Sequence, residues 1–156
     1  MLTKNGQSLF SPGLTSNGQP NDRNIKTTGG TTKSTGSAGY GTGKNIYNAI
    51  NSINLIVGSG TTAPTINDYS LESQVSSLTS TSSSNSGNRT PNYDDGYILS
   101  CSRTFKNNTA NDVTINELGL VTYLQNIGDF LIAREVLSAP VTVAPNASYT
   151  FSIVIS

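Results

Sequence analysis

The last residues of the chain show the clearest alternation of apolar and polar positions. From Tyr149 to Ile155 every odd position is apolar, and these positions alternate with Ser148, Thr150 and Ser152. A repeat of two places alternate side chains on opposite faces of an extended strand. The pattern therefore predicts a strand with one buried and one solvated face.

Similar but shorter patterns predict further strands upstream. In residues 113–124 the apolar positions change parity, so we expect a bulge near residues 117–119. Residues 125–129 contain Gly128 and are expected to close a hairpin onto the next strand. Pro145 is expected in the turn at residues 144–147. The remaining expected strands cover residues 53–57, 71–78, 97–105, 130–137 and 141–143.

The stretch from Ser76 to Pro91 is dominated by Ser, Thr, Asn and Gly, and we expect it to be a long exposed connection. Residues 45–51 are ambiguous between helix and strand. About seven strands with short turns in the last 110 residues or so predict an all-β fold. The expected architecture is an antiparallel β-sandwich or partly closed barrel, with the strands after residue 97 forming a meander.

The composition divides the chain into two parts. Residues 1–44 contain eight hydrophobic residues, against 45 in residues 45–156. The first part is rich in Gly, Ser and Thr and cannot offset its ordering entropy by burial. We therefore expect residues 1–44 to be an extended, low-complexity arm and residues 45–156 to be a β-sandwich body.

Charge also differs between the two parts, although the whole chain is neutral. Residues 1–44 carry five basic residues and one acidic residue, for a net charge of +4, and residues 45–156 carry four basic and eight acidic residues, for −4. A neutral chain has no overall field to attract nucleic acid, so no nucleic-acid partner is expected. A basic arm and an acidic body would attract each other between copies of the chain.

Missing residue types exclude several kinds of chemistry. The chain has no His, which excludes a Ser-His-Asp triad and any His-containing metal site within one chain. Its one cysteine, Cys101, cannot form an internal disulfide. No apolar run approaches the roughly 20 residues that span a bilayer, so no membrane partner is expected. The glycines before Lys44 lack phosphate-loop spacing, and no cofactor or metal is expected.

Charged residues interrupt the apolar pattern at three positions inside expected strands, namely Arg103, Glu117 and Arg134. We expect these residues to form partly buried ion pairs or contacts between subunits rather than a catalytic site. Because Glu117 and Arg134 lie on the two strands of one hairpin, we expect them to pair. Two weaker possibilities are a metal site at Asp94 and Asp95, and a glycosidase carboxylate pair drawn from Glu117, Asp129 and Glu135.

Several segments of the body resemble, in order and spacing, small structural virion proteins of tailed bacteriophages. The resemblance covers about residues 53–156 and leaves out the arm. It lies in the run NLIVGSGTTAPTINDYSLE at residues 54–72, FKNN at 105–108, VTINELGL at 113–120, LIAREVL at 131–137, PVTV at 140–143 and the closing strand.

This resemblance implies a non-enzymatic subunit of the capsid or tail, either a capsid-decorating protein or a tail or connector component. Its partners would be other copies of itself, as a homo-oligomer in the particle, and other virion proteins. It would be made in the host cytoplasm and end in the virion. The candidate assembly residues are Leu9, Phe10, Leu14 and Tyr40 in the arm, with Glu117 and Arg134 in the body.

Two other classes of function remain open. A carbohydrate-binding fibre or receptor-recognition module would use exposed aromatic side chains, for which Tyr40, Tyr69, Tyr93 and Tyr97 are candidates. The chain has no Trp, which argues against this reading. An enzyme would depend on carboxylates such as Glu117 or Asp129.

Overall fold

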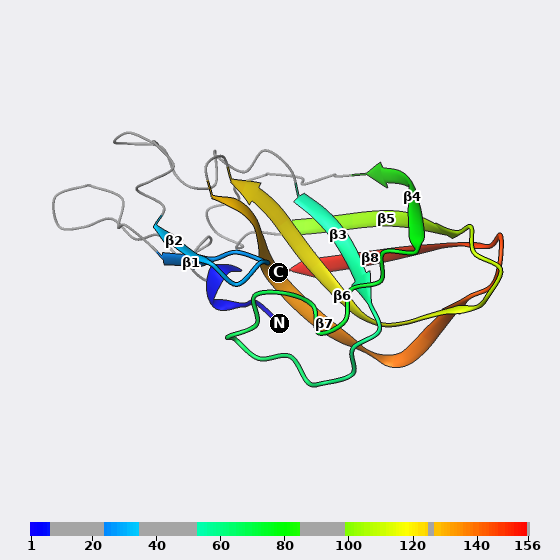
Figure 1. Ribbon diagram of the computed structural model, residues 1–156, viewed down its shortest axis with the longest axis horizontal. Helices are drawn as coiled ribbons and strands as arrows, with labels where there is room; N and C mark the ends of the chain where they lie inside the picture. Colours follow the sequence, from blue (N-terminus) through cyan, green and yellow to red (C-terminus); the bar gives the residue numbers. More distant parts are fainter. Residues whose placement is uncertain (7–23, 35–52, 85–98, 125–126, 156) are drawn as a thin grey trace, which may run out of the picture.

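The protein is an all-β structure, as expected (Figure 1). The computed structural model describes residues 1–6, 24–34, 53–84, 99–124 and 127–155. One three-stranded antiparallel sheet has the order β3-β6-β7 and a second has the order β4-β5-β8. A two-stranded ribbon, β1-β2, completes the described strands. Their bounds are β1 Asn24–Lys26, β2 Thr32–Ser34, β3 Ile53–Gly58, β4 Leu78–Ser84, β5 Leu99–Asn107, β6 Val113–Leu124, β7 Gly128–Val143 and β8 Ser148–Ile155.

The two three-stranded sheets pack face to face, with their strands inclined to one another (Figure 1). Leu55, Leu120 and Phe130 come from one sheet and Phe105 and Phe151 from the other, and all five belong to one buried cluster. Alternate side chains of each strand point into this core, which is the arrangement of a sandwich. The expected fold class is therefore confirmed.

The hairpin of β6 and β7 is the most extensive pairing in the molecule. Its register shifts between Ile115 and Glu117 and again between Leu120 and Val121, on either side of the predicted bulge. Gly128, at φ 101°, opens β7 in the backbone region that glycine tolerates best. Four residues of β7, 137–140, lie opposite the single residue Asn116. The two strands expected at 130–137 and 141–143 are therefore one irregular strand, with Pro140 in the bulge.

Two expectations about the polar middle of the chain are wrong. Residues 78–84 form strand β4, within the stretch expected to be an exposed connection, and the strand expected at 71–78 is absent from this described region. Ser and Thr can pair their backbone along an edge strand without a hydrophobic face. Leu78, only 8% exposed, anchors the start of β4 in the core.

The strands after residue 97 do not form a simple meander. β5 pairs with β8, whereas β6 and β7 belong to the opposite sheet. The chain crosses between sheets at residues 108–112 and again at the turn 144–147. In that second turn Ala147 N–H donates to the Ala144 carbonyl at 3.0 Å and Asn146 has φ 61°.

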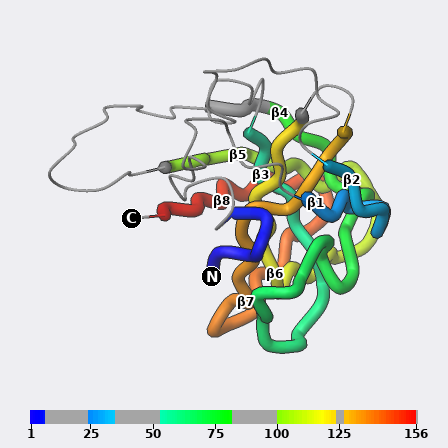
Figure 2. Tube along the Cα trace, turned by 90° about the vertical axis from the view of Figure 1, so that its left-hand side faces the viewer, coloured from blue at the N-terminus to red at the C-terminus, as the bar shows by residue number. Residues whose placement is uncertain are grey.

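The described parts of residues 1–44 lie against the body rather than apart from it. Leu2 bridges to Ala133 of β7, and Ile25 of β1 is 1% exposed within the core cluster. Asn5 holds β1 by a pair of bonds: its amide donates to the Lys26 carbonyl at 2.7 Å and accepts from the Lys26 N–H at 3.1 Å. Figure 2 shows this segment and the β1-β2 ribbon next to β6 and β7. The expected separation of arm from body does not hold for these residues.

Candidate functional site

The most elaborate polar cluster centres on Arg134 of β7, which is 4% exposed. Its Nε donates to Glu117 Oε2 at 2.7 Å, so the predicted pair is confirmed. Glu117 is fully buried on β6, and Arg134 lies directly opposite Gly119, two residues further along that strand. Because residues two apart in a strand share a face, Glu117 and Arg134 meet on the outer face of the sheet.

The Glu117 carboxylate holds the loop of residues 59–73 against this face. Its Oε1 accepts the N–H groups of Gly60 at 3.1 Å and Ser73 at 2.8 Å, and its Oε2 accepts that of Glu72 at 3.2 Å. Charged acceptors make hydrogen bonds roughly twice as strong as neutral ones. One buried side chain therefore fixes both ends of the loop.

Arg134 binds the same loop through its other two nitrogens. One lies 2.8 Å from Asp68 Oδ2 and the other 3.5 Å from Glu72 Oε2. Both carboxylates also bind within the loop: Asp68 accepts from Thr65 N–H and Oγ1, and Glu72 from Thr62 N–H and Oγ1. We call Arg134, Glu117, Asp68 and Glu72 the Arg134 cluster.

The pKa values of the cluster follow from these contacts. Burial by itself would raise the pKa of Asp68, but hydrogen bonds from Arg134 and Thr65 outweigh it and lower that pKa below its ordinary value. The backbone and hydroxyl hydrogen bonds from Thr62 lower the pKa of Glu72. Burial opposes charge on Arg134, but its bonds to Asp68 and Glu117 raise its pKa. Asp68, Glu72 and Arg134 therefore remain charged near neutral pH.

Glycine is required where the loop meets Glu117. A Cβ built on Gly58 would lie 2.5 Å from Glu117 Oε1, and one on Gly60 would lie 2.6 Å from the same atom. Real side chains do not tolerate such distances. The Gly58-Ser59-Gly60 sequence thus lets the backbone approach the carboxylate closely enough to donate to it.

Arg103, which also interrupts an apolar pattern, makes a different set of contacts. Its Nε donates to Ser80 Oγ at 2.7 Å, and another nitrogen donates to the Leu55 carbonyl on the opposite sheet at 3.0 Å. Its guanidinium lies 5.5 Å from the centre of the Phe105 ring. These contacts are all with neutral groups, so the expected ion pair is not found among the described residues, and Arg103 links the two sheets.

The carboxylates considered for catalysis do not converge. Glu117 is committed to Arg134 and the loop, whereas Glu135 pairs in register with Leu118 and so lies on the other face of the sheet. Asp129 is exposed at the start of β7. Within the part of the chain that the structure describes, no three His, Cys, Asp or Glu side chains are grouped to hold a metal ion. Asp94 and Asp95 lie outside the described residues.

Most of the other predicted candidates also lie outside the described residues, namely Leu9, Phe10, Leu14, Tyr40, Tyr93 and Tyr97. Tyr69 is described, and the ammonium group of Lys26 lies 3.7 Å from its ring centre. That face of the ring is therefore occupied by the protein itself. In the described regions no helix has the length and apolar character needed to cross a membrane.

Three polar partners, Asp68, Glu72 and Asn107, were not anticipated from the sequence. Asp68 and Glu72 occur in a polar loop with no pattern to connect them to Arg134. Asn107 is fully buried, and its amide donates to the carbonyls of Asn111 and Val143 at 2.7 and 2.8 Å. An isolated Asn at a strand end reads as an ordinary turn residue, so no local signal identifies this role.

Comparison of the chain with protein-family models, with curated proteins and with solved structures finds no match.

Proposed function

We propose that this protein is a non-enzymatic structural subunit of a bacteriophage virion, present in multiple copies as a capsid-decorating subunit or as a tail or connector component. The observation that carries the proposal is the Arg134 cluster. Its ionisable side chains bind one another and the 59–73 loop, which is the work of a rigid scaffold rather than of a reaction centre. The resemblance of residues 53–156 to phage virion proteins supports the same conclusion.

The cluster also suits a subunit that has to keep its shape under load. A loop held by one buried carboxylate and one buried guanidinium has little freedom to rearrange, because breaking either contact leaves an unpaired buried charge. In a particle, symmetry repeats each contact many times, so a rigid body with modest contacts is sufficient for firm attachment.

Detection in purified particles tests this proposal. Particles of a phage whose genome encodes the protein would be banded on a density gradient, analysed by quantitative mass spectrometry and labelled with gold-conjugated antibodies. We expect many copies per particle, with gold on the head for a decorating subunit or on the tail for a tail or connector component. Absence of the protein from infectious particles would contradict the proposal.

Of the tyrosines considered for the carbohydrate-binding alternative, only Tyr69 is described, and Lys26 covers one face of its ring. A glycan-array signal that Tyr→Ala substitution abolishes would favour that alternative over the structural role.

A further inference from the structure

The protein protects two of the outer edges of its sheets with its own chain. The edge of β3 is covered by residues 73–75. There the Ser59 N–H donates to the Ser73 carbonyl at 2.8 Å, and the Val75 N–H donates to the Val57 carbonyl at 2.9 Å. The edge of β7 is covered by residues 1–3, where Thr3 N–H donates to Ile132 at 2.9 Å. Covering a strand edge in this way blocks pairing with other chains.

β8 lacks such protection within the described residues. It is the last strand of its sheet and pairs only with β5 there. Its sequence, SYTFSIVI, has no charged residue and no proline, which are the residues that usually discourage pairing at an edge. Val154 is 64% exposed. In the part of the chain that the structure describes, β8 is thus a hydrophobic edge strand that is open to an added strand.

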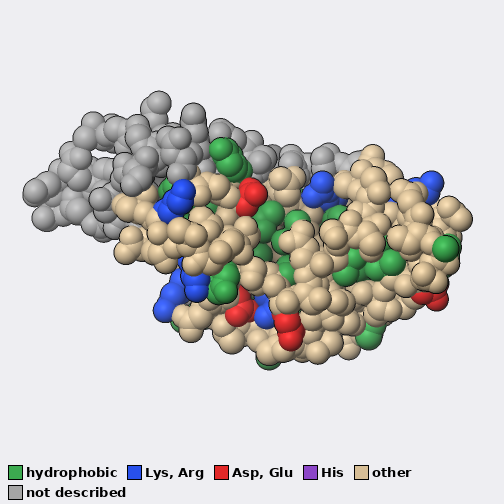
Figure 3. Space-filling model, in the orientation of Figure 1, with side chains coloured by type: hydrophobic (Ala, Val, Ile, Leu, Met, Phe, Trp, Pro, Cys, Tyr) green, Lys and Arg blue, Asp and Glu red, His purple; other side chains and the backbone are tan. Residues whose placement is uncertain are grey.

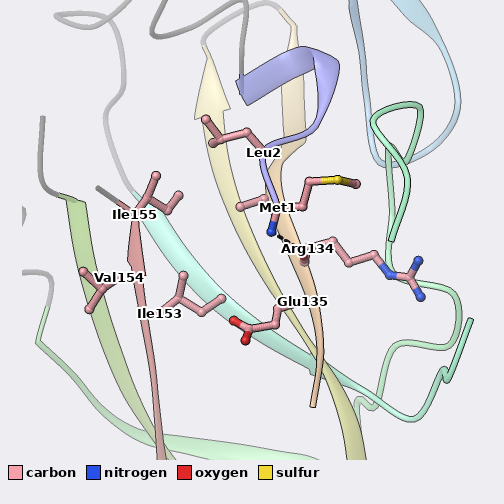
Figure 4. Close-up of a pocket in the computed structure, with 8 residues that line it drawn as sticks. Met1, Leu2, Arg134, Glu135, Ile153, Val154 and Ile155 are labelled. Atoms are coloured by element: carbon pink, nitrogen blue, oxygen red, sulfur yellow. Dashed lines mark hydrogen bonds between the residues drawn. The ribbon is translucent and has the colours of Figure 1, made fainter. Parts of the chain in front are cut away.

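A pocket of about 260 Å³ lies beside this edge (Figure 4). Residues 1–3 extend the β3-β6-β7 sheet beyond β7, whereas the facing sheet ends at β8 in the described part of the chain. The pocket lies beside β8, beneath the part of the first sheet that extends past it. Leu2 and Ile155 line it, the side chain of Glu135 lies at it, and the side chain of Arg134 points away (Figure 4). We call this pocket the β8 slot, lined by Met1, Leu2, Ala133, Arg134, Glu135, Ile153, Val154 and Ile155.

We propose that the β8 slot receives an extended segment from residues 7–23 of a second copy of this chain, which pairs with β8. This inference rests on the multi-copy assembly proposed above. An added strand would satisfy the outer backbone groups of β8 and place an apolar side chain in the pocket, as in other cases of strand addition. Leu9, Phe10 and Leu14 supply apolar side chains of suitable size.

The described residues on either side of 7–23 explain why a second copy is the occupant. The Asn5–Lys26 bonds hold the point where the segment leaves, after Gly6, close to the point where it returns, at Asn24. The 17 residues between these two points are enough to reach a neighbouring molecule, because an extended chain spans about 3.3 Å per residue.

Charge does not oppose the same contact. The described residues include six basic and six acidic side chains, and charged groups are scattered over the face of the molecule that Figure 3 shows. β8 is uncharged, and residues 7–23 contain one Asp and one Arg, which balance. Segment and edge can therefore approach without repulsion between like charges.

Solution mass tests whether the slot mediates self-association. We expect the full-length protein to form oligomers by light scattering and Val154→Lys to raise the dissociation constant at least about tenfold, because a charge at the edge disfavours pairing. Ile66→Lys, at a similarly exposed apolar residue (42%) on the 59–73 loop, should have no effect. A monomeric wild type, or oligomers unchanged by Val154→Lys in a variant with wild-type melting temperature, would overturn the proposal.

Disulfide trapping identifies the occupant. Full-length chains carrying Val154→Cys would be mixed with chains carrying Ser11→Cys under mild oxidation; the native Cys101 is only 2% exposed. We expect a mixed dimer joined through residues 154 and 11, and none when Ile66→Cys replaces Val154→Cys. Dimers joined only through two copies of residue 154 would refute the assignment. So would a chain carrying both Val154→Cys and Ser11→Cys that forms the disulfide only within one molecule.

The outcomes separate this inference from the proposed function. A mixed disulfide in a protein that is absent from phage particles would leave the slot assignment standing and remove the virion role. A protein that is abundant in particles but gives no mixed disulfide would leave the virion role standing and remove the slot assignment.

Discussion

At the scale of single residues, Glu117 and Arg134 bind each other and hold the 59–73 loop on the outer face of their sheet. Both residues interrupt apolar runs on neighbouring strands of one hairpin, and a buried charge there requires a partner of opposite sign. Asp68 and Glu72 lie 45 or more residues before Glu117 in a loop without periodicity, so only the folded chain shows that they complete the cluster.

Replacing Arg134 should destabilise the protein strongly. Arg134→Met leaves the fully buried Glu117 carboxylate without its cation, and breaking a buried pair in this way costs about 3–5 kcal/mol. Urea unfolding of the variant would measure the loss, with Lys106→Met as a control on the surface of β5. Adding Glu117→Gln to Arg134→Met should recover part of the stability. An unchanged unfolding midpoint for Arg134→Met would show that the pair is not structural.

Acid should weaken the cluster through Asp68. The folded state lowers the pKa of Asp68 below its ordinary value of 3.8. A lowered folded pKa means that the stabilisation is complete above the unfolded pKa and is lost as pH falls through the lower folded pKa. Asp68→Asn should therefore be less stable than wild type at pH 7, and the difference should shrink as the pH falls below about 4. Thermal unfolding across this range checks the slope, and a constant difference would contradict the role of Asp68.

At the scale of elements, period-two patterning located the strands that have one buried face. It failed at β4, where Ser and Thr pair along the backbone without an apolar face, and at residues 71–77, whose apolar side chains do not form a strand. Leu71 packs instead on the outer face of a sheet, within 2.8 Å of a Cβ built on Gly119. Side chains that are buried beneath a loop follow no fixed period. Where a few of them fall at alternate positions, as in residues 71–77, the sequence resembles that of a strand.

The contact between the 59–73 loop and Glu117 should be sensitive to the smallest added side chain. Gly60→Ala places a methyl group within 2.6 Å of both Glu117 and Glu72, which forces the loop off its hydrogen bonds. Overpacking of this kind costs roughly 1–3 kcal/mol. Gly29→Ala is the matched control, because its Cβ would meet only Thr27 at 3.9 Å. Equal melting temperatures for the two variants would show that the loop adapts freely.

At the scale of the whole molecule, the first 34 residues belong in part to the body. The core cluster includes Ile25, which pairs within the β1-β2 ribbon and is 1% exposed. Ile25→Ala should therefore cost about 2–5 kcal/mol, as for a core position. Chemical denaturation measures this, and Lys33→Ala on the exposed strand of the same ribbon serves as control. A loss of less than about 0.5 kcal/mol in the free energy of unfolding would show that Ile25 does not contribute to the core.

Deletion experiments have to respect this division. Removing all of residues 2–44 would take away Leu2, Thr3 and Ile25 together with the segments outside the described residues, so the body would be damaged. Replacing residues 7–23 by a short Gly-Ser linker keeps both sides of the Asn5–Lys26 contact. We expect this variant to fold with a near-wild-type melting temperature but to associate less and to enter particles less. Equal incorporation would contradict a role in assembly.

The sequence by itself determined the all-β class, the β6-β7 hairpin with its irregular register, the terminal strand and the Glu117–Arg134 pair. Each of these follows from alternation or from charge placed within one or two neighbouring strands. Only the tertiary structure decided the sheet to which each strand belongs, the contacts of Asp68 and Glu72 with Arg134, and the packing of residues 1–6 and 24–26 on the body. These contacts join residues far apart in the chain, and neither periodicity nor composition records which distant segments meet when the two sheets close on one core.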